Sequence, residues 1–460
     1  MNDHPTLRPY GDLRESETLE LKESFNQRVV ETAGAFANTA GGTILVGVDE
    51  GGTVRGAPVT EELMKDWAVR ISNASEPTLI PDVSTLDVDG RTVGVIQVRD
   101  HPMRPVAIRG RCYRRVGASN RQMTPTEISE LHLHSQGMTW DMVTAPGSSI
   151  EELDLGKVRD YVERARRAGR RAFPDDEDPS VILEKTGLVK DGRPTWAAMI
   201  AFGERPPVQA KVRCGKIRGT HMIVDAYEVS APLLEQVDEV MAYMRRVLQL
   251  SFEFTGQARR TEVWEYPLDA VREAVTNAVC HRDYTSSAEV LIQIFDDELV
   301  ISNPGSLPLG MTMEMLMDPN HRSVPRNRHI AMLFHDVELI ERYGSGIERI
   351  HAECDRLQVP RPEFTEQEHG FQVVFRKDIY HEENLRGMGL SERQIRAIIH
   401  FKVEGRITNR AYQEVTEVSE RTALRDLRDL CDRGLLERHG RTGRDTEYQI
   451  TRQKPAITPP

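Results

Sequence analysis

Three polar side chains share one face of a predicted helix at residues 269–282, whose sequence is DAVREAVTNAVCHR. Glu273, Asn277 and His281 are four residues apart, so they stack on one side of an α-helix. An amide oxygen can hold Mg²⁺, and a carboxylate one turn earlier can orient or deprotonate a water beside a γ-phosphate. Glu273 is thus a candidate catalytic base and Asn277 a candidate metal ligand, although the helix read alone is only amphipathic with polar residues on one side. His281 either lines the same pocket or packs at the helix end.

Two glycine-bearing turns follow this helix along the chain. In ISNPGSLP (301–308) a strand ends at Gly305, which permits a close approach of the backbone. In ERYGSGIERI (341–350), Gly344 and Gly346 precede a helix whose N-terminus could bind phosphate. Each motif alone is weak evidence for a nucleotide site. Their order along the chain, after a helix that carries E-x-x-x-N, is much stronger evidence.

That order resembles the GHKL, or Bergerat-type, ATP-binding fold, and more closely its divergent branch described as a helicase C-terminal or divergent AAA domain. The resemblance implies ATP and Mg²⁺ as cofactors, with Asn303 where typical members carry an aspartate that contacts adenine. Asn303 can still accept a hydrogen bond, but it lacks the charge. No GxxxxGK[ST] motif occurs in the chain, so a P-loop helicase motor is not expected. The alternative is an oligomeric scaffold whose nucleotide site does not hydrolyse ATP.

A second constellation lies near the N-terminus, where Glu15, Glu20, Lys22 and Asp49 fall on or beside two predicted strands. Three carboxylates at one sheet edge could hold Mg²⁺ or Mn²⁺, which could activate water beside a phosphate that Lys22 neutralises. The alternative is a solvated strand whose charges form salt bridges.

The segments ESETLELK (15–22), AFANTAGGTILVGVDEGGTVRG (35–56) and YRRVGASNR (113–121) resemble the Schlafen-type AlbA_2 domain. The resemblance implies binding of DNA or RNA. Some members are endoribonucleases that cut transfer or ribosomal RNA with a carboxylate trio, which would here be Glu15, Glu20 and Asp49. A phosphate-contacting edge would then comprise Arg114, Arg115, Ser119 and Asn120.

The C-terminal residues 388–452 have the pattern of a winged helix, with three helices and a terminal hairpin. Ser419 is the expected N-cap of the last helix, and Ala423, Leu424, Leu427 and Leu430 form its expected buried stripe. The arginines expected to face DNA are Arg421, Arg425 and Arg428 on the helix and Arg441 and Arg444 on the wing. Acids alternate with them, which leaves protein binding as the alternative.

These elements predict an α+β multidomain protein. The expected divisions are an AlbA_2-like domain (1–125), a mixed connecting region without assigned chemistry (126–255), a GHKL-like α/β sandwich (256–382), a winged helix (388–452) and a disordered tail (453–460). The net charge of −12 gives no global attraction to nucleic acid, so contacts must come from local patches. One patch is the segment 99–121, with seven arginines and one acid; the other is RARRAGRR (164–171), alternatively a solvated helix face.

No apolar run is long enough for a membrane span, and the first residues lack a signal-peptide core, so we expect a cytoplasmic protein without a membrane partner. Symmetric pairing is common among two-site nucleic-acid binders, so we also expect a homo-oligomer. The combination looks like a class of bacterial regulators. The leading hypothesis is an ATP-binding, nucleic-acid-binding protein that acts in transcription or defence, and the enzyme alternative is a metal-dependent endoribonuclease.

Overall fold

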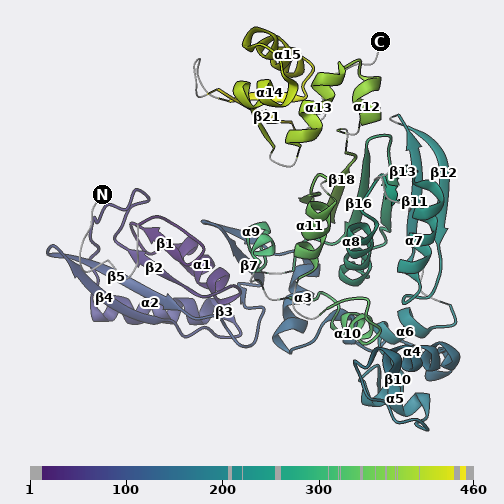
Figure 1. The fold of residues 1–460 in the computed structure, drawn as a ribbon. Coiled ribbons are helices and arrows are strands. Elements are labelled where there is room, and N and C mark those ends of the chain that lie inside the picture. Colours follow the sequence, from purple (N-terminus) through teal and green to yellow (C-terminus); the bar gives the residue numbers. More distant parts are fainter. Residues whose placement is uncertain are drawn as a thin grey trace. The chain divides into compact units, whose positions relative to one another are not determined.

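The structure is a computed structural model (Figure 1). It describes residues 13–451 except 206–209, 220, 254–260, 309, 320, 322, 342–344, 358, 368–369, 379, 381, 403–404 and 440–445. Two compact units are present. The first contains Met1–Gly147, Arg193–Trp196 and Pro308–Thr312, and the second contains Ser148–Gly192, Ala197–Leu307 and Met313–Pro460. Among the described residues, every helix is too short or too polar to cross a bilayer.

The first unit contains two four-stranded sheets, ordered β1-β2-β5-β4 and β3-β6-β7-β8. Its elements are β1 (Leu19–Lys22), α1 (Gln27–Ala37), β2 (Gly42–Val46), α2 (Glu61–Ala74), β3 (Ser75–Glu76), β4 (Asp82–Val88), β5 (Arg91–Val98), β6 (Ala107–Ile108), β7 (Arg111–Val116), β8 (Ser119–Gln122) and α3 (Pro125–Ser135), then the 3-10 turn η2 (Trp140–Met142).

Apolar side chains from α1 and α2 pack on the first sheet and form its main core. Leu19 and Leu21 of β1 belong to a second cluster with residues of β2, β4 and β5. Because side chains alternate along a strand, Glu20 points away from its two leucine neighbours, toward the side where Thr32 of α1 lies. The carboxylate of Glu20 is therefore placed inside the domain.

The second unit begins with a small helical segment and continues into a large sheet. Its elements up to residue 376 are η3 (Ile150–Glu152), α4 (Leu155–Ala168), α5 (Pro179–Lys185), β9 (Val189–Lys190), α6 (Trp196–Phe202, from its second residue), β11 (Val212–Arg218), β12 (Met222–Val229), α7 (Gln236–Val247), β13 (Leu250–Glu253), β14 (Thr261–Trp264), α8 (Leu268–His281), β15 (Val290–Ile294), β16 (Glu298–Pro304), α9 (Met313–Met317), α10 (Arg328–Asp336), α11 (Gly346–Arg356), β17 (Glu363–Gln367) and β18 (Gly370–Arg376). The short strand β10 (Arg193–Pro194) belongs to the first unit.

Six strands form one sheet in the order β12-β11-β15-β16-β18-β17. The strand expected to end near Gly305 is β16, and it forms a hairpin with β15, because the two pair antiparallel around a turn at 295–297. The parallel pairing of β11 with β15 carries the sheet back to Val212. The expected boundary at residue 255 therefore cuts this layer, and much of the connecting region belongs to the sheet and to the helix α7 that covers it.

Helix α8 is amphipathic in the way the sequence predicts, and its bounds differ from the prediction by one residue at each end. Its buried stripe consists of Ala270, Val271, Ala274, Val275, Ala278 and Val279, which recur at helical spacing. This stripe packs α8 on β16, with α7 and α11 as neighbouring helices (Figure 1). The packing leaves the polar face of α8 turned toward the start of α11.

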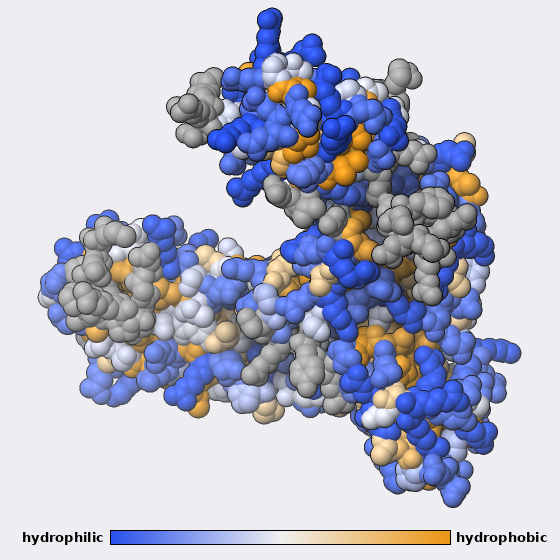
Figure 2. Space-filling view, viewed as in Figure 1, coloured by the Kyte–Doolittle hydropathy of each residue, from blue (hydrophilic) through white to orange (hydrophobic). Residues whose placement is uncertain are grey.

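The C-terminal part contains α12 (Glu382–Gly387), α13 (Glu392–Phe401), β19 (Arg406–Thr408), α14 (Asn409–Thr416), α15 (Glu420–Asp432), β20 (Leu436–His439) and β21 (Glu447–Ile450). The three strands pair in the order β19-β21-β20, and the helices and strands enclose a separate core. Hydrophilic residues cover most of the face of this part seen in Figure 2. The expected disordered tail lies outside the described residues.

Candidate nucleotide and nucleic-acid sites

The first residue of α11 contacts the polar face of α8. A Cβ atom added to Gly346 would lie 2.6 Å from Glu273 Oε1 and 3.1 Å from Asn277 Nδ2. Only glycine allows this approach without moving a side chain, which explains its position at the helix start. The structure thus brings together three of the predicted nucleotide-binding residues. Gly344 lies outside the described residues.

Glu273 is held by charge and by hydrogen bonds in a largely buried position. Arg349 of α11 lies 3.0 Å from each carboxylate oxygen. Burial raises the pKa of Glu273 above its ordinary value, and Arg349 and the Asn277 amide oppose the rise. Because the Asn277 amide nitrogen serves Glu273, its oxygen is the atom suited to meet a cation.

The other end of α8 meets the loop after β16. Gly305 has φ +109°, and an added Cβ would lie 2.9 Å from Asp283 Cβ, so a larger residue would strain the turn. Arg326 donates a hydrogen bond to the Ser306 carbonyl oxygen. Burial, with a contribution from Arg326, lowers the pKa of His281 to about 4, so its imidazole is neutral at pH 7. His281 therefore belongs to this end of the helix, about 12 Å along the axis from Glu273.

Asn303 of β16 has an unsatisfied buried acceptor. Its side chain is 8% exposed, and Oδ1 has no hydrogen-bond partner among the described residues. An orphaned buried carbonyl oxygen is costly unless a ligand supplies a donor. This observation fits an amino group of a nucleobase.

Asn327, the N-cap of α10, and Arg282, the C-cap of α8, hold the end of α8 in place, although the sequence motifs did not single them out. Asn327 Nδ2 donates to the carbonyl oxygens of Cys280 (2.9 Å) and Arg282 (2.8 Å), which closes the helix end. The buried Arg282 donates to the Lys211 carbonyl oxygen at 2.8 Å, just before β11. These contacts are non-local, so no sequence pattern could have indicated them.

The acidic residues of the first unit are not gathered as the metal hypothesis requires. Lys22 Nζ lies 2.7 Å from Glu15 and 2.8 Å from Glu20, whereas Asp49 pairs with Arg55 at 3.0 Å. Backbone bonding from Thr53 and the Arg55 charge lower the pKa of Asp49. In the part of the chain that the structure describes, no three His, Cys, Asp or Glu side chains could hold a metal ion.

Arg115 was expected to contact phosphate, but the structure contradicts this. Its side chain is 1% exposed and forms an ion pair with Glu20 at 2.6 Å. It also donates to the Ser16 carbonyl oxygen and to Asn120 Oδ1. A buried carboxylate needs a buried cation, so Arg115 serves the interior of the domain and is unavailable to nucleic acid.

Of the other residues of the predicted phosphate-contacting edge, two are bonded to neighbouring side chains and one is exposed. Arg114 is ion-paired with Glu127 at 3.3 Å, Asn120 donates to Thr32, and Ser119 is exposed. Exposed arginines that the prediction omitted are Arg109 and Arg111 of the tight β6–β7 turn. Neither forms a salt bridge with any described residue. The sequence feature that could have indicated their exposure is the Arg-Gly pair at 109–110, which is typical of a tight turn between two strands.

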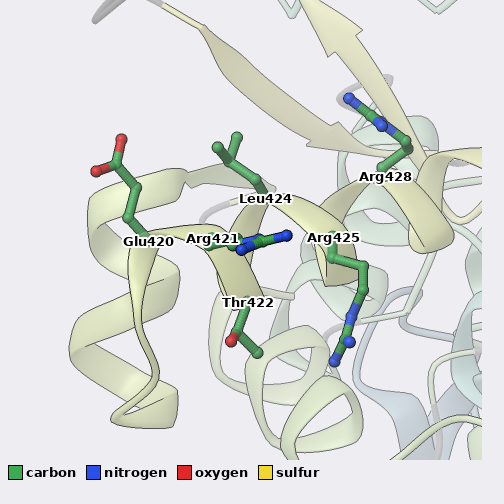
Figure 3. Close-up of a pocket in the computed structure, with 6 residues that line it drawn as sticks. All are labelled: Glu420, Arg421, Thr422, Leu424, Arg425 and Arg428. Atoms are coloured by element: carbon green, nitrogen blue, oxygen red, sulfur yellow. The ribbon is translucent and has the colours of Figure 1, made fainter.

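Helix α15 presents the arginines expected at the C-terminal site. Arg421, Arg425 and Arg428 are exposed and, with Leu424, line an open groove along the helix (Figure 3). Leu424 was expected in the buried stripe but is 44% exposed, because it lies on the arginine side. Arg441 and Arg444 lie outside the described residues.

The acids of α15 differ in their positions: Glu420 is exposed and lines the groove beside the arginines, whereas Asp426 and Asp429 bond inward. Asp426 also lies 3.8 Å from Arg425. Asp426 is 3% exposed and accepts hydrogen bonds from Arg393 and from the Tyr412 hydroxyl. Asp429 accepts from Gln394 (2.8 Å) and Arg433 (3.0 Å). Two of the alternating acids therefore turn inward, and the outward side carries three arginines and one acid, Glu420.

The second basic segment, 164–171, is used within the second unit. Arg170 lies 2.7 Å from Glu341, and Arg171 lies 3.0 Å from the buried Asp336, which also accepts from the Tyr161 hydroxyl. These pairs attach the end of α4 to the segment between α10 and α11. Arg170 and Arg171 are therefore used within the unit, whereas Arg167 is 78% exposed and pairs with Glu163 on the same helix.

Two family models match the chain. The model described as "Schlafen, AlbA_2" matches residues 15–124. The model HATPase_c_4, described as "Putative ATP-dependent DNA helicase recG C-terminal", matches residues 287–375. The second match contains Asn303, Gly305 and Gly346 and begins after α8, so Glu273 and Asn277 precede it.

Two solved structures are similar in part. The DIP2311 protein from Corynebacterium diphtheriae is 18% identical, with 97% of this chain and 95% of that chain covered and a TM-score of 0.44. The N-terminal domain of a RecG-related putative ATP-dependent DNA helicase protein from Nitrosomonas europaea is 26% identical, with 26% of this chain and 92% of that chain covered and a TM-score of 0.21. No curated protein matches the sequence significantly.

Proposed function

We propose that this chain, which combines a Schlafen AlbA_2 domain with a helicase-related ATPase-like domain, binds nucleic acid under the control of ATP. The observation that carries the proposal is the contact of Gly346 with Glu273 and Asn277. It joins the first turn of α11 to a carboxylate and an amide, the groups that a magnesium nucleotide requires.

The proposal assigns a role to each residue of the nucleotide site. The start of α11 binds phosphate through its backbone N–H groups, and Glu273 orients a water beside the terminal phosphate. Asn303 accepts a hydrogen bond from the base, and Gly305 lets the loop approach the nucleotide. Asn277 would hold the Mg²⁺, which neutralises phosphate charge when bound.

Nucleic acid is proposed to bind at two exposed basic surfaces. One is the β6–β7 turn with Arg109 and Arg111, in the AlbA_2 domain. The other is the outward face of α15 with its three arginines, in a C-terminal part whose element order favours a winged helix. This arrangement fits a regulator of transcription or a defence factor. A homo-oligomer remains part of the proposal, because symmetric pairing would duplicate both surfaces.

The proposal is tested by thermal unfolding of the full chain with and without Mg-ATP. Binding to the folded state raises the unfolding free energy by about 2.7 kcal/mol when ATP is at 100 times its Kd. We expect this shift in the wild type and its loss in Asn277→Ala. The exposed Asn73→Ala variant, on α2 in the first unit, serves as the matched control. An equal shift in Asn277→Ala, or no shift in the wild type, would rule out the site.

A further inference from the structure

The ion pair between Glu273 and Arg349 occupies the carboxylate that the proposed function assigns to the attacking water. One guanidinium nitrogen lies 3.0 Å from both carboxylate oxygens, so it occupies the position between them where a water could otherwise bind. Glu273 is 14% exposed, whereas Arg349 is 42% exposed. Of the two partners, Arg349 is the one with room to turn.

Arg349 also stands in the first turns of α11, three residues after the glycine that contacts Glu273 and Asn277. A polyphosphate bound at the start of this helix would bring several negative charges close to the guanidinium. Arginine binds phosphate oxygens in the same forked geometry as carboxylate oxygens. The terminal phosphate would therefore compete directly with Glu273 for Arg349.

We propose that Arg349 exchanges Glu273 for the terminal phosphate of ATP and thereby makes the site distinguish a triphosphate from a diphosphate. The inference rests on the proposed nucleotide site and goes further, because it assigns the discrimination to one residue. The exchange leaves the Glu273 carboxylate free to bind water only when the third phosphate is present. Arg349 is in this sense a positioning residue for Glu273.

The test compares the affinities of the full chain for Mg-ADP and for a magnesium complex of a non-hydrolysable ATP analogue. In Arg349→Ala, we expect affinity for the triphosphate to fall about tenfold to a hundredfold, as for loss of a charge-assisted hydrogen bond. Affinity for ADP should stay within about twofold of wild type. Arg349→Lys should recover part of the triphosphate affinity.

The matched control is Arg356→Ala on the same helix, because Arg356 pairs locally with Glu353 at 2.6 Å. It should leave both affinities unchanged. Glu273→Gln tests the exchange from the other side, since removing the competing carboxylate charge should preserve or increase triphosphate affinity. Glu273→Gln keeps the size of the side chain and the arginine itself, so it answers the question even if Arg349→Ala unfolds.

Two results would overturn the inference while leaving the nucleotide site intact. One is an equal loss of ATP-analogue and ADP affinity in Arg349→Ala, which would make Arg349 only a clamp between α8 and α11. The other is a fall in triphosphate affinity in Glu273→Gln. A wild-type chain that binds neither nucleotide would instead refute the proposed function itself.

Discussion

Single residues decide whether the proposed nucleotide site can form, and Gly346 is one of them, because it contacts both Glu273 and Asn277. In Gly346→Ala the new methyl group would meet Glu273 Oε1 at 2.6 Å, so the carboxylate must move. Alanine suits a helix at least as well as glycine, so we expect the unfolding free energy to change by less than about 1 kcal/mol. Mg-ATP affinity should fall at least about tenfold, or about 1.4 kcal/mol. Calorimetric titration measures the affinity.

Gly387→Ala is the control for this substitution, because an added Cβ there meets nothing within 4 Å. It should alter neither quantity. Unchanged ATP affinity in Gly346→Ala would mean that the contact with Glu273 and Asn277 does not belong to a nucleotide site.

Glu20 shows how a residue can look catalytic in the sequence and be structural in the fold. Replacing Glu20 by Gln leaves the buried Arg115 without its counter-charge, which costs about 3 kcal/mol of stability. Urea unfolding should detect the loss, and Glu61→Gln, in an exposed pair with Lys65, should cost far less. Manganese-dependent RNA cleavage that Asp49→Asn abolishes without destabilising the fold would favour the endoribonuclease alternative instead.

The predicted role of a single residue was wrong where its ion-pair partner lies far away in the sequence. Arg115 and Glu20 are separated by more than ninety positions, and the strand pattern of RCYRRVG cannot reveal that the arginine is buried. By contrast, Glu273 and Asn277 share one helix, so their common face followed from spacing alone.

The burial of His329 in helix α10 predicts that the stability of the protein depends on pH. His329 of α10 is 8% exposed, and burial, with the charges of Lys190 and Arg171, lowers its pKa to about 4. The unfolded chain, with an ordinary histidine pKa of about 6.5, binds the proton more readily. Stability contributed by neutral His329 is therefore present above pH 6.5 and lost as the pH falls toward 4.

Urea unfolding between pH 7.5 and 4.5 should show this loss, worth about 1–3 kcal/mol for a shift of this kind. His329→Gln should flatten the slope in that window. A slope that is unchanged in the variant would mean that His329 keeps an ordinary pKa in the folded protein.

Helix α15 makes a separate prediction about nucleic acid. If Arg425 contacts phosphate, Arg425→Ala should weaken binding to all sequences alike and reduce the slope of log affinity against log salt by about 1. Fluorescence anisotropy with labelled duplexes at several salt concentrations measures both. Arg410→Ala on α14, whose guanidinium pairs with Glu414 at 3.0 Å, is the control. A loss confined to one sequence, or no change in slope, would argue against a phosphate contact.

For whole elements, the sequence predicted where a helix lies better than it predicted which side chains and strands that element contacts. The spacing of apolar residues located α8 to within one residue at each end, because a helix is a local structure. It misplaced Leu424, since helical periodicity gives the width of a buried stripe but not its edges. The pairing of β11 with β15 depends on contacts that no local pattern contains.

For the whole molecule, the connecting region gains a structural role that its sequence did not suggest. It supplies two strands and a helix to the ATPase-like sheet, and Arg170 attaches α4 to Glu341. Glu341 lies five residues before Gly346, the first residue of α11. Nucleotide binding and the position of α4 should therefore influence each other. In the proposal, this link is the route by which bound ATP would act on α4.

The most direct test of the central claim is the affinity of the full chain for nucleic acid measured with and without saturating Mg-ATP. A coupling of about 1–3 kcal/mol, or about 5- to 150-fold in affinity, is typical of linked sites. We predict an effect of this size in the wild type and none in Asn277→Ala, tested with both DNA and RNA. Identical nucleic-acid affinity with and without bound Mg-ATP would contradict the claim that ATP controls nucleic-acid binding.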